Sequence, residues 1–407
     1  MTSRLAFRWT LRLGCAAAIG LAALGCASTD LTPATKSPTG LVLEEDERRI
    51  WNRAREEQET LRRARVEYDD PALKAYVNAV AQRVAPAEVR RAGIALDARI
   101  IKNPALNAFM YPNGTMYVHT GILARMENEA QLATLLAHEM THATHRHAVR
   151  RFRDIRNKTD FMAGFSVVTL PFGYWGLLAN LLGTLGMVAS VYGYSQDMER
   201  EADAEGFQLM VQAGYDPREA SKLFRHLKLW VEEEDKPEPF FFNTHPRLVE
   251  RIDSYDEIIA KNAQLFSRSE PLRIGEEAFL SHTRRMVLDN AALDLSAGRF
   301  LQAQKGCQKV LSLDPENARA TFLMGETYRI QNDPQKFAEA IWLYQRAIAL
   351  DPTYPDPHRG LGTLHYHDRQ SAQATAEFQQ YLQLAPAAAD RVHIQSLIES
   401  LQKEVQK

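Results

Sequence analysis

The 407-residue sequence contains only three cysteines, and its acidic and basic residues nearly cancel. Cys15 and Cys26 fall in an N-terminal segment that is expected to be processed, which leaves Cys307 as a lone free thiol. We therefore expect no intramolecular disulfide. The formal net charge of −2 gives no general attraction for nucleic acid, so we expect no nucleic-acid partner.

Charged residues are also absent from one internal stretch, 161–196, although they make up 25% of the sequence. Pro171 and Gly173 divide this stretch into a piece of about ten residues and another of about twenty, and only the second is long enough to span a bilayer. We expect an apolar lid on neighbouring helices or a membrane-facing hairpin. A plain segment of buried core is the alternative.

The first 26 residues have the layout of a bacterial secretory signal. Three arginines precede an apolar run that ends at Gly25-Cys26. This ending resembles a lipobox, which implies a signal peptide over 1–25 and a lipid on Cys26, whereas a simple cleaved signal is the alternative. Residues 26–42 are then a lipidated tether. Because Ala27 follows the cysteine, the resemblance implies the periplasmic face of the outer membrane.

The remaining sequence predicts an α+β, mainly helical fold with two parts, 43–265 and 270–407. Helix-favouring sequence before residue 84 is followed by strand-like stretches at 94–101 and 115–118, which predict a small sheet. Apolar, helix-favouring residues from 130 onward predict a buried helix after this sheet.

The C-terminal part repeats. Asp314-Pro315, Asp351-Pro352 and Ala385-Pro386 lie 37 and 34 residues apart, and each closes a predicted helical pair. This spacing is the tetratricopeptide period and predicts an all-α array over 270–407. Such stacked pairs form a concave surface that binds peptides or partner proteins, although they could also serve only to stabilise the preceding part.

The predicted buried helix ends in the motif His138-Glu139-Met140-Thr141-His142. At 3.6 residues per turn the two histidines lie one above the other, so both can bind one zinc ion while Glu139 faces the water that the ion activates. The alternative is a helix whose histidines only pack or face solvent.

A catalytic zinc needs a third protein ligand and an open fourth position. Glu199 and Asp203 are four residues apart and share one face of a predicted helix, so one can bind zinc while the other accepts a hydrogen bond from a ligand histidine. Glu201 points elsewhere. We expect His145 and His147 to be structural or solvated, because a fourth protein ligand would close the site.

Together these motifs, with Asn128-Glu129-Ala130-Gln131 before them and Thr244-His245-Pro246 and Arg251 after them, resemble the HtpX/BepA-type gluzincin peptidases. The likeness is greatest to the periplasmic members that carry tetratricopeptide repeats. It implies a zinc metalloprotease domain over 43–265, with one zinc ion held by His138, His142 and Glu199.

The resemblance also implies roles for four other residues. Glu139 would be the general base, and Asp203 would support a ligand histidine from behind. His245 and Arg251 would be the candidates for stabilising the oxyanion of the reaction. In relatives of this type the matching histidine can also occupy the metal's open position and keep the enzyme latent, so His245 has two competing interpretations.

The expected function is a zinc endopeptidase, lipid-anchored in the periplasm, that degrades misfolded or misassembled outer-membrane proteins. Its expected partners are those proteins, their assembly machinery and the membrane, which it reaches through the lipid on Cys26. The alternative is a chaperone or assembly adaptor whose zinc is structural or blocked by His245.

Overall fold

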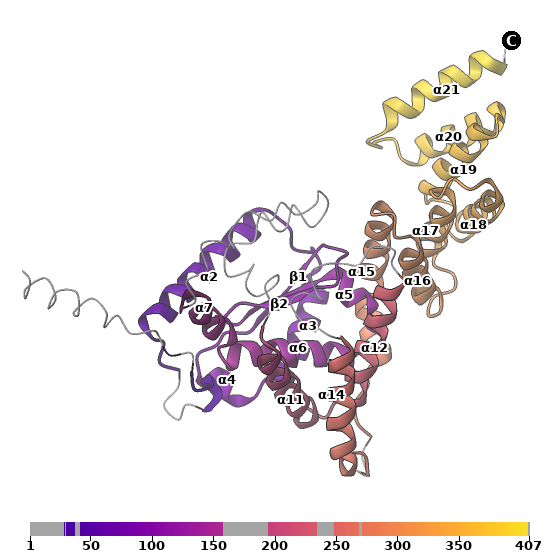
Figure 1. The fold of residues 1–407 in the computed structure, drawn as a ribbon. Coiled ribbons are helices and arrows are strands. Elements are labelled where there is room, and N and C mark those ends of the chain that lie inside the picture. The colour runs from indigo at the N-terminus through magenta and orange to yellow at the C-terminus, as the bar shows by residue number, and fades with distance from the viewer. Residues whose placement is uncertain are drawn as a thin grey trace, which may run out of the picture.

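The computed structural model describes residues 28, 30–36, 41–157, 194–233, 248–267 and 271–405. In Figure 1, an N-terminal body of helices around a small sheet is followed by a row of paired helices that leads away to the C-terminus. The α+β, mainly helical fold is thus confirmed. The predicted signal peptide, Cys26 and all but three residues of 161–196 lie outside the described residues.

Residues with known capping preferences begin some helices of the N-terminal body. Asp70 caps one of them by accepting a hydrogen bond from the Leu73 backbone, and Pro71 occupies its first position. The helices are α2 (Glu45–Arg63), α3 (Pro71–Val84), α4 (Ala87–Arg91), α5 (Thr120–Arg125), α6 (Glu129–Thr144), α7 (His147–Asn157), α11 (Gln196–Gln212), α12 (Arg218–Glu232) and α14 (Leu248–Lys261), with 3-10 turns η1 (Ala34–Lys36) and η3 (Ala263–Ser267).

The sheet has three strands in the order β1-β3-β2. The predicted strands are β1 (Asp97–Ile101) and β3 (Thr115–His119), which run parallel, and β2 (Ala108–Met110) pairs antiparallel with β3. The chain turns from β2 to β3 at Gly114, whose φ is +97°. A side chain there would lie 2.6 Å from the Ala95 carbonyl oxygen, so the turn requires glycine.

The C-terminal helices pair as the repeat period predicts. The ring of Tyr344 fits against Gly325 and Gly360, where added Cβ atoms would lie 2.7 and 2.8 Å from it. These helices are α15 (Glu276–Ser296), α16 (Phe300–Leu311), α17 (Ala318–Arg329), α18 (Phe337–Leu350), α19 (Asp356–His367), α20 (Ser371–Leu384) and α21 (Arg391–Val405), with the 3-10 turn η4 (Pro334–Lys336).

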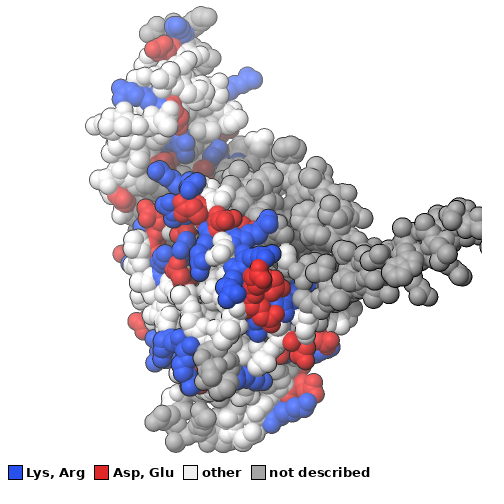
Figure 2. Space-filling model, turned by 90° about the vertical axis from the view of Figure 1, so that its left-hand side faces the viewer, with Lys and Arg blue, Asp and Glu red and all other residues white. Residues whose placement is uncertain are grey.

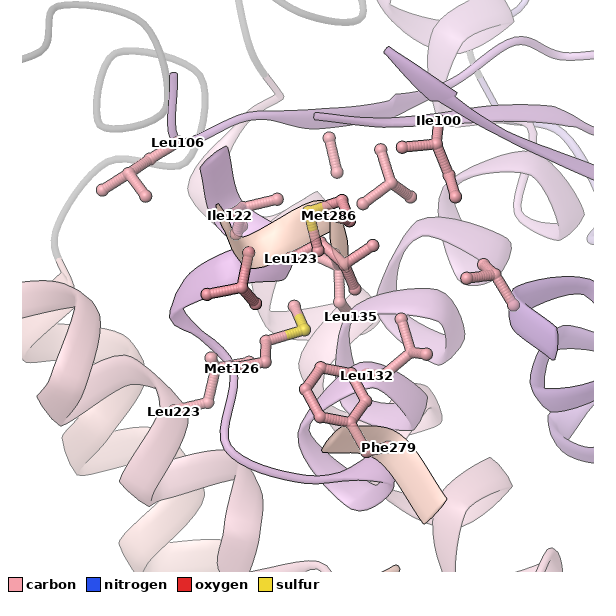
Figure 3. Close-up of a cluster of buried hydrophobic side chains, with 14 of the residues drawn as sticks. Ile100, Leu106, Ile122, Leu123, Met126, Leu132, Leu135, Leu223, Phe279 and Met286 are labelled. Carbon is pink, nitrogen blue, oxygen red and sulfur yellow. The ribbon is translucent and has the colours of Figure 1, made fainter. Parts of the chain in front are cut away.

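Helix α15 belongs to both parts of the molecule. Its residues Phe279 and Met286 lie in one buried cluster with Leu132 and Leu135 of α6, as Figure 3 shows. The carbonyl of Ile274, just before α15, also accepts a hydrogen bond of 3.0 Å from the α6 backbone. The hydrophobic core therefore continues across the expected boundary between the two parts.

Part of the expected tether packs on the N-terminal body. Leu31 and Ala34 are buried. Arg153 donates a hydrogen bond of 2.7 Å to the Ser28 carbonyl, and Arg146 donates one of 3.3 Å to the Thr32 carbonyl. The expectation of a free tether is wrong over 30–36, because its two apolar side chains and its carbonyls find partners far along the chain.

The described surface matches the balanced composition. In the face shown in Figure 2, basic and acidic side chains are interspersed, with no large area of one sign. Helix α2 contributes pairs within itself, such as Arg62 with Glu59 at 2.6 Å. Among the helices of the described ranges, none combines the length and apolarity needed to cross a bilayer.

Candidate metal centre

Helix α6 carries the predicted metal-binding motif and is buried along its whole length. The Asn128 side chain caps its first turn by accepting a hydrogen bond from the Gln131 backbone at 3.0 Å. On the facing helix α11, a Cβ atom at Gly206 would lie 3.2 Å from the His138 backbone nitrogen. Because glycine has no side chain, α11 packs directly on α6 and brings its carboxylates to the two histidines.

Three side chains from these helices converge on one point. The Nε2 atoms of His138 and His142 are 3.0 Å apart. The Glu199 carboxylate lies 3.5 Å from the first and 3.6 Å from the second. All three residues are buried, and within the described ranges they form the one group of His, Cys, Asp or Glu side chains with the spacing of a metal site.

These distances fit a zinc ion. Tetrahedral zinc with ligand bonds of about 2.0–2.1 Å separates its ligand atoms by about 3.3 Å, close to the spacings found here. Burial and Arg251 disfavour a charged His138, but hydrogen bonds with Asp203 and Glu199 outweigh them and raise its pKa to about 9. The surroundings therefore favour positive charge at this point, which a divalent cation supplies.

Asp203 and Arg251 support His138 from its other side. The Asp203 carboxylate lies 2.9 Å from His138 Nδ1 and accepts two hydrogen bonds from Arg251, of 2.5 and 3.2 Å. Burial alone would raise the pKa of Asp203, but the charge of Arg251 and the hydrogen bonds hold it below its usual range. The Arg251 guanidinium itself rests 4.0 Å from the centre of the Phe224 ring.

Arg251 was expected to stabilise the oxyanion of the reaction, but it lies on the side of His138 that faces away from the metal position. Its Nη2 atom is 2.9 Å from His138 Nδ1, on the opposite side of the imidazole from the Nε2 that faces the metal position. A substrate oxyanion forms on the metal side, so this place suits positioning of His138 and does not suit contact with the oxyanion. Asp203 does lie behind a ligand histidine, where the resemblance placed it.

Two further buried residues adjoin these ligands, one in the sequence and one by ring contact. Glu139 follows His138 on α6 and is buried. The ring of Tyr194 stacks on that of His142, with centroids 3.9 Å apart and planes 16° apart. Its hydroxyl is buried and has no hydrogen-bond partner among the described residues. Sequence reasoning missed Tyr194, which ends an apolar stretch and belongs to no motif.

Of the remaining candidate residues, the structure describes His145, His147 and Glu201. His245 lies outside the described residues. His145 and His147 are both buried, and His147 Nδ1 is 2.8 Å from His142 Nδ1. Glu201, expected to point elsewhere, lies 3.0 Å from the other nitrogen of His147.

Comparison with known proteins agrees with this geometry. Residues 71–259 match the model of peptidase family M48, and residues 329–399 match a tetratricopeptide repeat model. The first match contains the metal-binding motif, Glu199, Asp203 and Arg251. Zinc is the metal on which family M48 depends, in agreement with the donor set found here.

Several named relatives share part of the chain. The beta-barrel assembly-enhancing protease of Escherichia coli is 24% identical over 283 residues, which is 61% of this chain and 57% of the relative. The mitochondrial metalloendopeptidase OMA1 of Arabidopsis thaliana is 32% identical over 135 residues, or 33% of this chain and 26% of the relative. The chain thus spans about half or less of the length of these relatives. Residues 71–259 thus form a domain of peptidase family M48, and tetratricopeptide repeats follow on its C-terminal side.

Proposed function

We propose that the chain is a zinc-dependent endopeptidase that hydrolyses misfolded or misassembled envelope proteins, outer-membrane proteins above all. The observation that carries the proposal is the convergence of His138, His142 and Glu199 from two helices onto one buried point. Glu139, the next residue after His138, is buried as well. The family match and the relatives, which are named as a protease and a metalloendopeptidase, support the same chemistry.

Each side chain of the centre has a distinct task in peptide hydrolysis. When bound, zinc polarises the scissile carbonyl and lowers the pKa of the attacking water. Glu139 takes a proton from that water and later delivers it to the leaving amine. Asp203 accepts the Nδ1 proton of His138, which keeps the Nε2 lone pair turned toward the metal position, and Arg251 holds Asp203 in place.

The substrate class and location rest on less direct support. One group of relatives is named for enhancing beta-barrel assembly. The repeats expose large aromatic side chains, Trp342 and Tyr366, which suit them as a platform for substrates or for the assembly machinery. We place the protein in the periplasm, anchored to the outer membrane by a lipid on Cys26. Release of a Cys26→Ser variant from the membrane fraction is the expected outcome.

Replacing Glu139 by Gln tests the mechanism. The purified variant should bind zinc as wild type does, because Glu139 is not a ligand. It should lose cleavage of an unfolded outer-membrane β-barrel protein by at least about a hundredfold, the usual contribution of a general base. Zinc content and a gel-based cleavage assay measure the two properties separately. Normal cleavage by the variant would disprove the mechanism.

The adaptor alternative has its own support in the exposed aromatic side chains of the repeats, which need no metal to bind a partner. A His245→Ala variant separates the alternatives, since His245 is the residue expected to hold the enzyme latent. Cleavage by the variant or by wild type supports the endopeptidase. Capture of unfolded β-barrel protein without cleavage by either one supports the adaptor.

A further inference from the structure

We propose that His147 is a positioning residue for the zinc ligand His142 and that Glu201 and Arg150 act through it. This inference rests on the zinc site of the proposed function but not on the identity of the substrate. The pattern of the sequence gave His147 and Glu201 no such role.

Four side chains form a continuous chain of contacts that starts at the metal ligand. His142 Nδ1 lies 2.8 Å from His147 Nδ1. His147 Nε2 lies 3.0 Å from Glu201 Oε2, which also accepts a hydrogen bond of 3.0 Å from Arg150. The His147 side chain is fully buried, whereas that of Glu201 is 39% exposed. The chain of contacts therefore runs from the buried centre to the surface.

A bound metal fixes the direction of every hydrogen bond in this chain. His142 must offer the lone pair of Nε2 to the metal, so its Nδ1 carries the proton and donates it to His147 Nδ1. His147 must then carry its own proton on Nε2, where the Glu201 carboxylate accepts it. The other neutral form of His147, and its imidazolium form, would each point an N–H group at the N–H group of His142.

The backbone before α7 places His147 for this contact. Arg146, the preceding residue, has a φ of +59°, which a residue other than glycine rarely adopts. Its guanidinium is held by the buried Glu47 carboxylate through two hydrogen bonds, one of them 2.8 Å long. This anchor on α2 offsets the strain of the turn and directs the next side chain back onto His142.

The two ligand histidines are thus supported in parallel ways. His138 gives its Nδ1 proton directly to Asp203, which is paired with Arg251. His142 contacts the imidazole of His147, which in turn contacts the Glu201 carboxylate, and this carboxylate is paired with Arg150. Glu201 and Asp203 are two residues apart on α11 and so face different directions, which is why Glu201 needs His147 as a bridge.

Zinc affinity of the purified protein, measured by competition with a chromophoric chelator, tests the proposal. His147→Phe keeps an aromatic ring but removes the acceptor, and should weaken zinc binding about 10–100-fold, the usual loss when such an outer partner is removed. His147→Asn keeps an oxygen near the Nδ1 position and should restore part of the affinity. The visible spectrum of the cobalt-substituted protein should shift in His147→Phe, because the direction of the His142 ring changes.

His145→Phe is the matched control. His145 is buried next to the same carboxylate, at 3.7 Å from Glu201, but its Nδ1 lies at hydrogen-bond distance from the Thr144 hydroxyl. Its replacement should therefore change zinc affinity less than twofold. Glu201→Gln, at a partly exposed position that tolerates substitution, should weaken binding and add nothing further in the His147→Phe background. If Glu201 acts on the metal site through His147, the double variant should lose no more zinc affinity than His147→Phe alone.

Outcomes that overturn this inference differ from those that overturn the proposed function. If wild type binds zinc tightly and a folded His147→Phe variant binds it equally tightly with an unchanged cobalt spectrum, His147 is not a positioning residue. If His147→Phe fails to fold, the Glu201→Gln variant tests the proposal by itself. Unchanged zinc affinity in that variant would disprove the proposed role of His147. If wild type itself binds no zinc, the proposed function fails.

Discussion

Helix α6 and the repeat helices are stabilised in opposite ways. Every residue of α6 is buried, and some of its polar side chains are partnered by residues far away in the sequence, as His138 is by Asp203. In the repeats, a helix packs chiefly on the next one along the chain, and aromatic rings such as Tyr344 fit against glycines of adjacent helices. A zinc centre therefore needs the whole fold around it, whereas a repeat needs only its neighbours.

The largest effect we predict is for Arg251→Met. Removing this guanidinium leaves the Asp203 carboxylate charged and buried without its cation, which should lower the free energy of unfolding by about 3–5 kcal/mol. Zinc affinity should fall as well, because Asp203 no longer holds His138. Urea unfolding and chelator competition measure the two losses.

Arg329→Met is the matched control in the repeats. Arg329 makes a similar two-bond pair with Glu326, at 2.6 and 2.8 Å, but its side chain is 25% exposed. Glu326 keeps a hydrogen bond from Tyr344, so the loss should be smaller than for Arg251, about 1–2 kcal/mol, and zinc affinity should stay unchanged. Equal losses in both variants would mean that burial does not distinguish the two regions.

A second pair of variants compares two buried phenylalanines. Phe279→Ala removes a ring from the core that α15 shares with α6, and should cost at least about 3 kcal/mol and weaken the zinc centre. Phe378→Ala removes a ring from a separate cluster near the C-terminus. It should loosen α19 to α21 but leave zinc content and the protection of α6 amides unchanged in hydrogen exchange. Loss of zinc in Phe378→Ala would contradict the separation.

Of the fold, local patterns predicted the parts with local causes. The repeat period marked the helical pairs, and strand-like stretches of sequence marked β1 and β3. The histidine spacing predicted the face of α6, but the residues alone left Glu199 and Asp203 as equal candidates for the third ligand. Only the resemblance to a family separated them.

Parts that the sequence did not predict depend on contacts between distant segments. The docking of Leu31, the place of Arg251 and the contact of Glu201 with His147 each join residues tens of positions apart. The periodic pattern of apolar residues within one helix or strand does not indicate such a contact. The same reasoning explains why a polar, proline-containing stretch was expected to be a tether when part of it is packed.

The pH dependence of stability tests the first turn of α6. Burial would raise the pKa of Glu129, but hydrogen bonds from Tyr215 and Tyr76 and the charge of Arg83 prevail and lower it. A carboxyl whose pKa is lower when folded stabilises the protein above its unfolded pKa of about 4.3, and this contribution is lost as pH falls through the folded pKa.

Glu129→Gln should therefore be less stable than wild type at pH 7 by about 1–3 kcal/mol, since Gln keeps only one of the two acceptor oxygens and loses the charge that pairs with Arg83. The difference should shrink as the pH falls below about 4. Urea unfolding over this range measures it, with the exposed repeat residue Glu316, changed to Gln, as the control. A difference that stays constant with pH would show that Glu129 contributes through packing alone.

The smallest effect on stability is predicted for Trp342→Ala, a substitution on the surface of the repeats. The Trp342 side chain lies on α18 and is 51% exposed, so its loss should change the free energy of unfolding by less than about 0.5 kcal/mol. Zinc content and cleavage of a short unstructured peptide should also stay unchanged, because this residue lies on a repeat helix and not on a helix that carries the metal ligands. Cleavage of a full-length unfolded β-barrel protein should fall if the repeats present substrates. A parallel fall for both substrates would instead mean that the repeats act on the centre itself, and the contrast between a fold-dependent centre and a locally stabilised platform would no longer hold.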